Sequence, residues 1–425
     1  MGYFDPAEKQ PLRQLGWSDV NTPSAQTLAL TAAEEGIVLL QNDGTLPFAR
    51  SVKKIAVVGP MANATTQMQG NYQGIAPFLV SPFDGLQNVG FQVTLSSGTT
   101  VTGNDTSEFA AAVAAAKSAD AVVYVGGIDE TVESEGNDRT SITWPGNQLE
   151  LIDELAQAGK PLVVVQMGGG QVDSSSLKSN KAVRTSSRIR LCHPADSFQV
   201  NALIWAGYPG QSGGAALANI ISGKTAPAGR LPITQYPADY VNEIPMTDMA
   251  LRPHDGGPGR TYKWFTGTPV FEFGSGQHFT TFALSWASPP PATFAISELV
   301  ASAKHAGVAF TDLAPLGTFR VNVKNTGRVA SDYVALLFSN TTAGPAPAPL
   351  QQLVAYTRVK GVAPGRTATA ELTVKLGQIA RVDENGDSAL YPGKYTVWLD
   401  TTKEIAHSFE LTGERAQIVS WPQPS

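Results

Sequence analysis

Cysteine is almost missing from this 425-residue sequence, which contains only Cys192. A single cysteine excludes a disulfide within the chain, so cysteine usage does not indicate a redox compartment. No run reaches the about 18 apolar residues of a membrane-spanning helix, which excludes a membrane as partner. Lysine and arginine form no cluster and the formal net charge is −6, so the positive surface of a nucleic-acid-binding protein is also lacking. The first residues, Met1–Pro6, have neither the basic end nor the apolar core of a signal peptide.

Apolar runs alternate with helical patterns over the first two thirds of the chain. After a polar segment at 1–24, apolar residues recur at helical spacing from Ser24 to Leu40. Strands and helices then follow with short turns: strands at 54–58, 91–95, 121–125, 161–167 and 201–206, and helices at 109–117, 147–158 and 213–221. Asp105 and Glu108 form a capping-box-like pair before the helix at 109–117. This alternation predicts an α/β three-layer sandwich with a mostly parallel sheet, over residues 25–284.

The last third of the chain has a different pattern. A stiff proline-rich linker at Ser288–Ala292 precedes short alternating runs separated by turn signals. Such runs without helices predict an all-β sandwich of the immunoglobulin or fibronectin III-like type, over residues 285–425. The acidic stretch Asp383–Asp387 lacks the twelve-residue calcium pattern, so we expect a hairpin turn there.

The most informative stretch is Ala121–Arg139, where a buried strand ends in two glycines and four acids follow. Catalytic groups of an open α/β sheet gather in the loops after the carboxyl ends of its strands, which is where this loop lies. Gly136 lets another backbone or a sugar approach Glu135 closely. Asp138 and Arg139 support the loop if they pair and hydrogen-bond. The alternative is a solvated acidic turn without function.

A second candidate site is the segment Gly210–Gly214, which matches the G-x-S-x-G nucleophile elbow between a strand and a helix. It would make the protein a serine esterase with Ser212 as nucleophile. The histidine that this mechanism requires would be one of the four that follow, namely His254, His278, His305 and His407. None of these has a local pattern that recommends it.

The segment Val183–Gln199 interrupts the approach to the strand at 201–206 and is basic and aperiodic. It contains Cys192 and His193, but this pair lacks the spacing of metal ligands, so we predict no metal site. The glycine run Gly168–Gly170 lacks the lysine of a phosphate loop and the spacing of a dinucleotide fingerprint. We expect it to form a tight turn, and we expect no cofactor.

Six segments in order resemble glycoside hydrolase family 3, particularly its fungal β-xylosidase branch. They are Leu15–Phe48, Gly126–Ile152, Gly159–Leu177, Trp205–Leu217, Ala226–Pro237 and Phe271–Phe282. The resemblance covers nearly the whole chain. It implies the C-terminal α/β sandwich of that family followed by a fibronectin type III-like domain, and it makes Ser212 part of a structural turn.

The resemblance also implies a catalytic role for the acidic loop. In the family, a (β/α)8 barrel supplies an aspartate nucleophile and the sandwich supplies a glutamate as general acid/base. By the pattern E-G-x-D-R this glutamate is Glu135, with Glu133 as the alternative. We expect residues 1–24 to be the linker from a barrel that this chain lacks, so that no nucleophile is present and the chain alone has negligible activity.

The expected function is therefore that of the C-terminal portion of a retaining exo-β-xylosidase acting on xylo-oligosaccharides. A β-glucosidase or an α-arabinofuranosidase of the same family is the alternative within this class, and a non-catalytic sugar-binding module is the alternative outside it. The resemblance implies secretion, and the three sequons at Asn63, Asn104 and Asn340 suit a glycoprotein. The segment 183–199 has no counterpart in the family, which suggests a retained intron.

Overall fold

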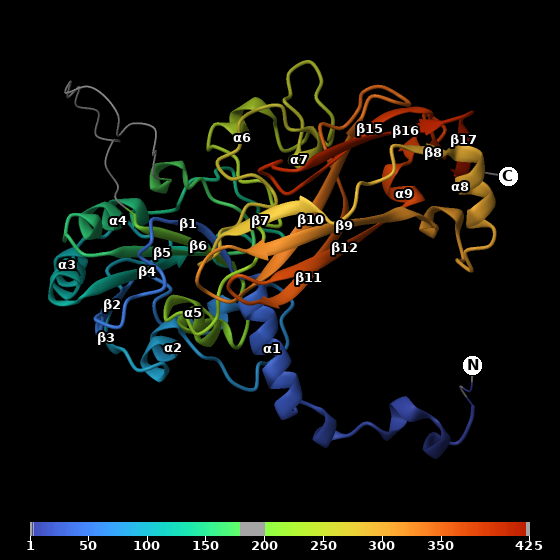
Figure 1. Cartoon of the computed structure of the whole chain (residues 1–425). Helices are drawn as coiled ribbons and strands as arrows, with labels where there is room; N and C mark the ends of the chain where they lie inside the picture. The colour runs from blue at the N-terminus through green and yellow to red at the C-terminus, as the bar shows by residue number, and fades with distance from the viewer. Residues whose placement is uncertain (1, 3, 179–199, 422–425) are drawn as a thin grey trace.

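The structure, a computed structural model, describes residues 2, 4–178 and 200–421. An exposed arm with three short 3-10 turns (Ala7–Lys9, Pro11–Gln14 and Trp17–Asp19) leads into helix α1 (Pro23–Gly36). This arm extends away from the body of the molecule (Figure 1). The body consists of an α/β sandwich followed by a β-sandwich, which confirms the predicted fold class.

The α/β sandwich is built on a six-stranded sheet. Its strands are β1 (Val38–Asn42), β2 (Lys54–Val58), β3 (Gln92–Ser96), β4 (Ala121–Gly127), β5 (Leu162–Met167) and β6 (Ala202–Gly207). They lie in the order β1-β6-β5-β4-β2-β3, and every neighbouring pair is parallel except β1 and β6. All residues of β4 and β5 are buried, because the sheet is covered on both faces.

Helices cover the two faces of this sheet (Figure 1). On one face, α1, α2 (Pro82–Asn88) and α5 (Gly213–Ile221) pack over a core that includes Val57 and Val123. On the other face, α3 (Phe109–Ser118) and α4 (Gln148–Ala156) pack over a core that includes Ala56 and Val122. Alternate residues of each strand thus enter opposite cores, as the two-residue period of a strand requires.

Two local predictions were wrong. The helix expected to run to Leu40 ends at Gly36, and the next residues form β1, because the apolar run from Ile37 to Leu40 is fully buried beside β6. The capping pair before α3 does not form either. Asp105 instead accepts hydrogen bonds from Ser107, and the side chain of Glu108 caps nothing.

The β-sandwich contains three sheets. One has the order β11-β10-β15-β16-β8, the second β12-β9-β7 and the third β13-β14-β17. The strands are β7 (Phe282–Trp286), β8 (Thr293–Ala295), β9 (Pro315–Asn325), β10 (Ser331–Thr341), β11 (Gln352–Val362), β12 (Thr367–Lys375), β13 (Arg381–Val382), β14 (Ser388–Leu390), β15 (Gly393–Leu399), β16 (Ala406–Thr412) and β17 (Ala416–Val419). Its core joins residues from the two larger sheets, such as Phe319 and Leu337.

The expectation that residues 285–425 contain no helices was wrong. Helix α8 (Ile296–Ala303) and the short helix α9 (Leu376–Ile379) both bury apolar residues against the β-sandwich. Strand β7 begins at Phe282, slightly before the expected boundary at 285, and pairs with β9. The acidic stretch after β13 is a hairpin turn as predicted, with Asp383 accepting from the N–H groups of Asn385 and Asp387.

A buried group of polar side chains joins the two sandwiches. Arg230 forms an ion pair of 3.1 Å with Asp400, and the side chains are only 11% and 4% exposed. The phenol of Tyr333 donates to the same carboxylate, and Arg230 also donates to the carbonyl oxygens of Val334 and Gly276. Because every charge here has a partner, burial of the group is tolerated.

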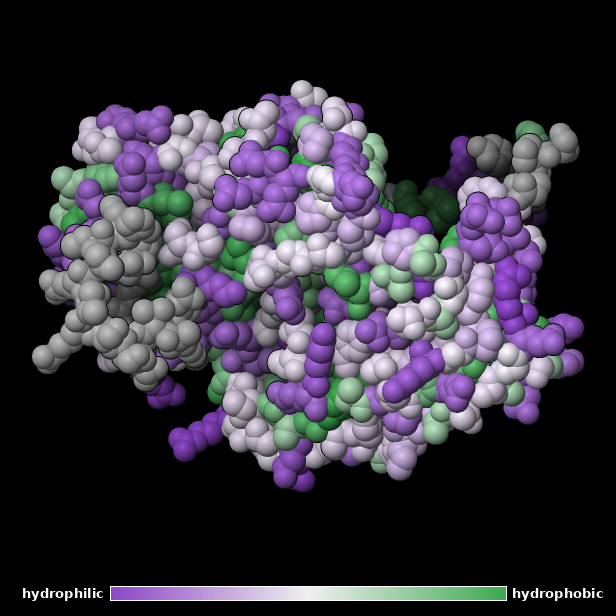
Figure 2. Space-filling model, turned by 90° about the horizontal axis from the view of Figure 1, so that it is seen from above, coloured by the Kyte–Doolittle hydropathy of each residue, from purple (hydrophilic) through white to green (hydrophobic). Residues whose placement is uncertain are grey.

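The surface of the molecule is mixed in character. On the face shown in Figure 2, hydrophobic residues form small separate patches among hydrophilic ones. None of the helices in the described ranges is long and apolar enough to cross a membrane. Short helices α6 (Tyr240–Glu243) and α7 (Thr261–Trp264) lie on the segment that links the two sandwiches.

Candidate active site

The acidic loop begins at the carboxyl end of β4, in the middle of the parallel sheet. Gln148, at the start of α4, fixes the end of the strand by donating to the carbonyl oxygen of Gly127 at 2.8 Å and accepting from its N–H at 2.9 Å. Gln148 is fully buried, so this contact is shielded from water. Asp129, 8% exposed, then accepts from the N–H of Thr131 and turns the chain outward.

Glu135 lies at the tip of a tight hairpin. Ser134 and Asn137 exchange two backbone hydrogen bonds of 3.1 and 3.0 Å, which leaves Glu135 and Gly136 as the two turn residues. Gly136 has φ +75, the conformation that the second central position of a type II turn requires and that favours glycine. The side-chain amide of Asn137 donates to the carbonyl oxygen of Thr131 at 3.2 Å and braces the hairpin. The turn therefore holds Glu135 outward in solvent.

Glu133 lies at the base of the hairpin and is held by the protein. One carboxylate oxygen accepts from the N–H of Gly170, and the other pairs with Nε of Arg139 at 2.8 Å. Arg139 also donates to the carbonyl oxygen of Gln171 at 2.8 Å. A Cβ atom at Gly170 would lie 2.3 Å from the Arg139 guanidinium and 2.4 Å from Glu133, so only glycine leaves room for the pair.

The supporting roles predicted for Asp138 and Arg139 divide between the two residues. Arg139 does fasten the loop, but its partners are Glu133 and the segment after β5 rather than Asp138. Asp138 is exposed and makes no hydrogen bond or ion pair within the described chain. The predicted tight turn at Gly168–Gly170 supplies the N–H group that holds Glu133.

The hairpin borders a pocket of about 330 Å³ with residues from three strand ends. Besides the acidic loop, Asn71 from the loop after β2 and Tyr208 directly after β6 line it. The hydroxyl of Tyr208 and one carboxylate oxygen of Glu130 are buried without a hydrogen-bond partner in the described chain. Burial raises the pKa of Tyr208, and the negative charges of Glu133 and Glu130 raise it further, so its hydroxyl stays protonated.

Asn71 and Tyr208 were not identified from the sequence. The signal that could have found Tyr208 is its position immediately after a buried parallel strand, the same rule that identified the acidic loop. Asn71 lies thirteen residues beyond β2 in an irregular loop, and no local pattern distinguishes it.

The serine-esterase alternative finds no support in the geometry. Ser212 is 4% exposed and precedes helix α5, and no described histidine hydrogen-bonds to it. The imidazole ring of His254 contacts Asp248. The ring of His278 hydrogen-bonds to the carbonyl oxygen of Pro227, and the ring of His407 to that of Pro291. Cys192 and His193 lie outside the described residues. Within those residues no group of three or more His, Cys, Asp or Glu side chains could hold a metal ion.

Comparison with known proteins adds independent information. The family model described as the glycosyl hydrolase family 3 C-terminal domain matches residues 37–279, and that of the fibronectin type III-like domain matches residues 333–403. The chain is 50% identical to the exo-1,4-beta-xylosidase xlnD of Emericella nidulans, over 99% of this chain and 50% of that protein. It is 51% identical to a "Probable exo-1,4-beta-xylosidase xlnD" of Aspergillus fumigatus, over 99% of this chain and 51% of that protein.

Solved structures agree with these matches. A GH3 exo-beta-xylosidase (XlnD) in complex with a xylobiose aziridine activity-based probe superimposes with a TM-score of 0.92 at 50% identity, over 99% of this chain and 53% of that one. A beta-glucosidase from Listeria innocua has a TM-score of 0.74 at 21% identity, over 96% of this chain and 52% of that one, which shows the shared fold alone.

The chain thus spans about half the length of the curated relatives it matches. The match to the C-terminal domain model covers more than half of the sequence, and the predicted fibronectin type III-like segment follows it. The resemblance noted in the sequence is therefore confirmed, and the chain belongs to glycosyl hydrolase family 3.

Proposed function

We propose that this chain is the C-terminal portion of a retaining exo-β-xylosidase and that Glu135 is its general acid/base. The observation that carries the proposal is the hairpin itself, which holds one unpaired carboxylate at its tip beside an open polar pocket. A general acid must bring its oxygen to the glycosidic oxygen of a substrate. An exposed carboxylate on a fixed turn can do so without first breaking a contact within the protein.

Glu133 is the less suitable of the two candidate acids. Both of its oxygens are already engaged, one by the N–H of Gly170 and the other by Arg139. Proton transfer from Glu133 would require this ion pair to open and would leave Arg139, 14% exposed, without its carboxylate partner. We therefore assign Glu133 and Arg139 a positioning role, in which they hold the base of the hairpin that carries Glu135.

The proposed reaction has two steps. Protonated Glu135 gives its proton to the glycosidic oxygen while a second carboxylate attacks the anomeric carbon, so that the leaving alcohol departs and a glycosyl ester forms. Glu135, now ionised, removes a proton from water, which attacks the same carbon and releases xylose and the second carboxylate. In retaining enzymes the two carboxyl groups lie about 5–5.5 Å apart. We propose that the second comes from the barrel of the family, as the resemblance implies.

Xylo-oligosaccharides are the proposed substrates. Support comes from the relatives, which are named exo-1,4-beta-xylosidases at about half sequence identity, and from the related structure that holds a xylobiose-derived probe. The pocket beside the hairpin is lined mainly by polar groups, which suits the hydroxyl groups of a sugar.

A chimaera tests this proposal. The chain would replace the matching half of the Emericella nidulans relative, and hydrolysis of an aryl β-xyloside would be measured for the chimaera and for the chain alone. We expect turnover by the chimaera only. Glu135→Gln should lower kcat by about 10²–10⁴-fold, the usual contribution of general acid/base catalysis, whereas Glu150→Gln on the exposed side of α4 should leave it unchanged. Turnover by the chain alone that Glu135→Gln abolishes would refute the need for a second domain.

We also propose that the protein is a secreted glycoprotein whose residues 25–284 and 285–425 form two domains. The side chains of Asn63, Asn104 and Asn340 are all exposed, as glycan attachment requires. Separate hydrophobic cores in the two sandwiches support the division. Expression in a fungal host followed by mass spectrometry of the secreted protein would test the glycosylation, since glycan-free peptides at all three sites would contradict it.

A further inference from the structure

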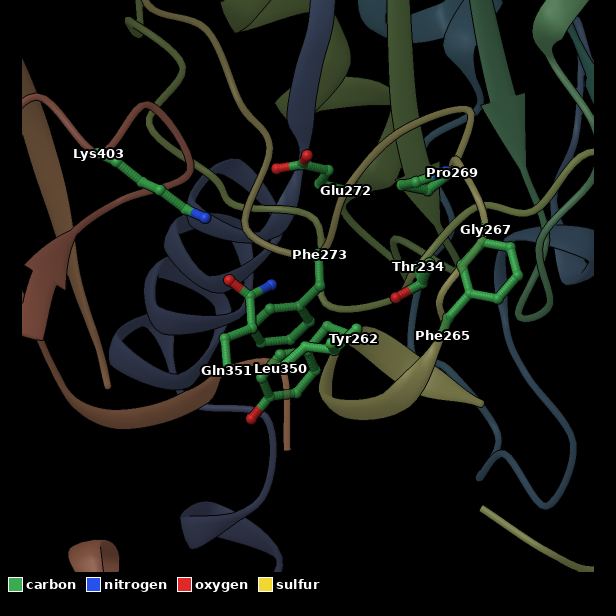
Figure 3. Close-up of a pocket in the computed structure, with 10 residues that line it drawn as sticks. All are labelled: Thr234, Tyr262, Phe265, Gly267, Pro269, Glu272, Phe273, Leu350, Gln351 and Lys403. Carbon is green, nitrogen blue, oxygen red and sulfur yellow. The ribbon is translucent and has the colours of Figure 1, made fainter. Parts of the chain in front are cut away.

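A second cavity lies where the α/β sandwich meets the β-sandwich, with a volume of about 210 Å³. Its lining comes from the segment before β7, with Thr234, Tyr262, Glu272 and Phe273, and from the β-sandwich, with Gln351 and Lys403 (Figure 3). It shares no residue with the pocket beside Glu135. Ligand pockets for drug-sized molecules measure about 300–1,000 Å³, so this cavity is of a size for a single small ring.

One wall of the cavity is aromatic and fixed in place. The rings of Tyr262 and Phe273 are stacked, with centroids 4.2 Å apart and planes inclined by 15°. The phenol of Tyr262 accepts a hydrogen bond from the N–H of Leu353 at 3.2 Å, and both rings pack edge-on against Phe338. These contacts hold the aromatic wall rigid before any ligand arrives, which reduces the entropy lost on binding.

The polar groups of the cavity have no partners in the described chain. Thr234 is 9% exposed, and its buried hydroxyl oxygen has no hydrogen bond within the described chain. This oxygen points toward the cavity in Figure 3. The carboxylate of Glu272, the amide of Gln351 and the ammonium group of Lys403 form no hydrogen bond or ion pair with the described residues either. A buried hydroxyl that lacks a partner in the protein is a group whose partner comes from a ligand or water.

Lys403 lines the cavity from the turn after β15 (Figure 3). It has φ +55, the left-handed conformation that non-glycine residues seldom adopt. Its ammonium group also lies 4.9 Å from the ring centroid of Trp398, over the ring face.

We propose that this junction cavity binds a single neutral pyranose ring, such as a xylose unit. The C–H face of a pyranose is apolar and fits the aromatic wall, while its rim of hydroxyl groups both donates and accepts hydrogen bonds. Glu272 accepts, Lys403 donates, and Thr234 and Gln351 do both, which matches a ring of hydroxyl groups. One carboxylate and one ammonium group balance in charge, so the cavity favours a neutral ligand over an anionic one. This proposal does not depend on the role assigned to Glu135.

Saturation-transfer NMR and calorimetry on the full 425-residue chain would test the proposal. The probes are methyl β-D-xylopyranoside and xylitol, an open-chain polyol that lacks the flat ring face. We expect saturable millimolar binding of the xyloside and none of xylitol. Lys403→Gly, which also removes the left-handed strain, and Glu272→Gln should each weaken binding about tenfold, because each removes a charged hydrogen-bonding group. Thr234→Val should weaken it about threefold or more, and Glu135→Gln should leave it unchanged.

Several results would overturn the proposal. They are equal binding of xylitol and the xyloside, unchanged binding in the Lys403→Gly and Glu272→Gln variants, or loss of binding in Glu135→Gln, which would place the sugar at the acidic loop. Circular dichroism would confirm that each variant is folded. If Thr234→Val unfolds the chain, the two exposed substitutions still decide the matter, and a crystal soaked in the xyloside would show whether density lies against Phe273.

Discussion

The tip of the acidic hairpin and the buried group around Arg230, between the two sandwiches, both contain charged side chains, but these are paired in one region and unpaired in the other. At the junction, Arg230, Asp400 and Tyr333 are buried and satisfy one another. At the hairpin, Glu135 and Asp138 are exposed and form no hydrogen bond or ion pair within the described chain. Paired buried charges maintain the architecture, whereas a charge that is held in position but unpaired is available to a substrate.

The largest expected effect on stability comes from breaking the junction. Arg230→Met leaves the carboxylate of Asp400 buried without its cation, and loss of one partner of a buried pair costs about 3–5 kcal/mol. Urea denaturation of the chain would measure the free energy of unfolding. The double variant Arg230→Met, Asp400→Asn should recover part of the loss, because no unpaired charge remains; equal losses in the single and double variants would contradict the pairing.

The junction should also make stability depend on pH. His278 is stacked on Tyr333 with ring centroids 5.5 Å apart, and burial together with the charge of Arg230 lowers its pKa from 6.5 to about 3. The unfolded chain therefore binds a proton more tightly than the folded one. The stability from neutral His278 is present above pH 6.5 and is lost as the pH falls toward 3.

Between pH 6.5 and pH 5 this loss should amount to roughly 2 kcal/mol, because each pKa unit corresponds to about 1.4 kcal/mol. Urea titrations of the wild-type chain and of His278→Gln at several pH values would measure it. The difference in unfolding free energy between the two proteins should shrink as the pH falls. A difference that stays constant over this range would show that His278 titrates normally.

A substitution at the base of the hairpin should lower the free energy of unfolding by a smaller amount. Glu133→Gln removes the ion pair with Arg139, whose side chains are 24% and 14% exposed, and this intermediate burial suggests a loss of about 1–2 kcal/mol. The effect should be local, so hydrogen exchange at the amide of Gly170, which donates to Glu133, is the sharpest measurement. Faster exchange at this amide is expected; an unchanged rate would mean that Glu133 does not hold the loop.

A loss of similar size should come from the turn itself. Gly136→Ala places a side chain at φ +75 and should cost about 1–2 kcal/mol, the penalty of the left-handed conformation. Gly36→Ala at the end of α1 is the matched control, since a Cβ atom there meets nothing within 4 Å and the φ angle is ordinary, and it should be neutral or slightly stabilising. Thermal unfolding of both variants tests the pair, and equal melting temperatures would contradict the strain at Gly136.

The parallel sheet could be predicted from the sequence because its strands are buried on both faces and read as continuous apolar runs. Strand β4 is the best example, since its apolar run was recognised and the rule that places chemistry at strand ends directed attention to the acidic loop after it. Strand β1 was mistaken for helix because its apolar residues directly continue the helical pattern of α1.

The different surroundings of Glu133 and Glu135 could not be predicted in the same way. Glu133 and Glu135 are two residues apart and chemically identical, and only the positions of Gly170 and Arg139 distinguish them. Gly170 is 37 residues away in sequence from Glu133, so the contact is tertiary. Tyr208 and the junction cavity likewise depend on segments that meet only in the folded chain.

The leaving-group dependence of the Glu135→Gln chimaera tests the central claim most directly. A dinitrophenyl β-xyloside has a leaving group that departs without protonation, whereas xylobiose requires a general acid. If Glu135 supplies the proton, the substitution should lower kcat/KM for xylobiose at least 100-fold more than for the dinitrophenyl xyloside. An equal loss on the two substrates would show that Glu135 supports the structure rather than the proton transfer.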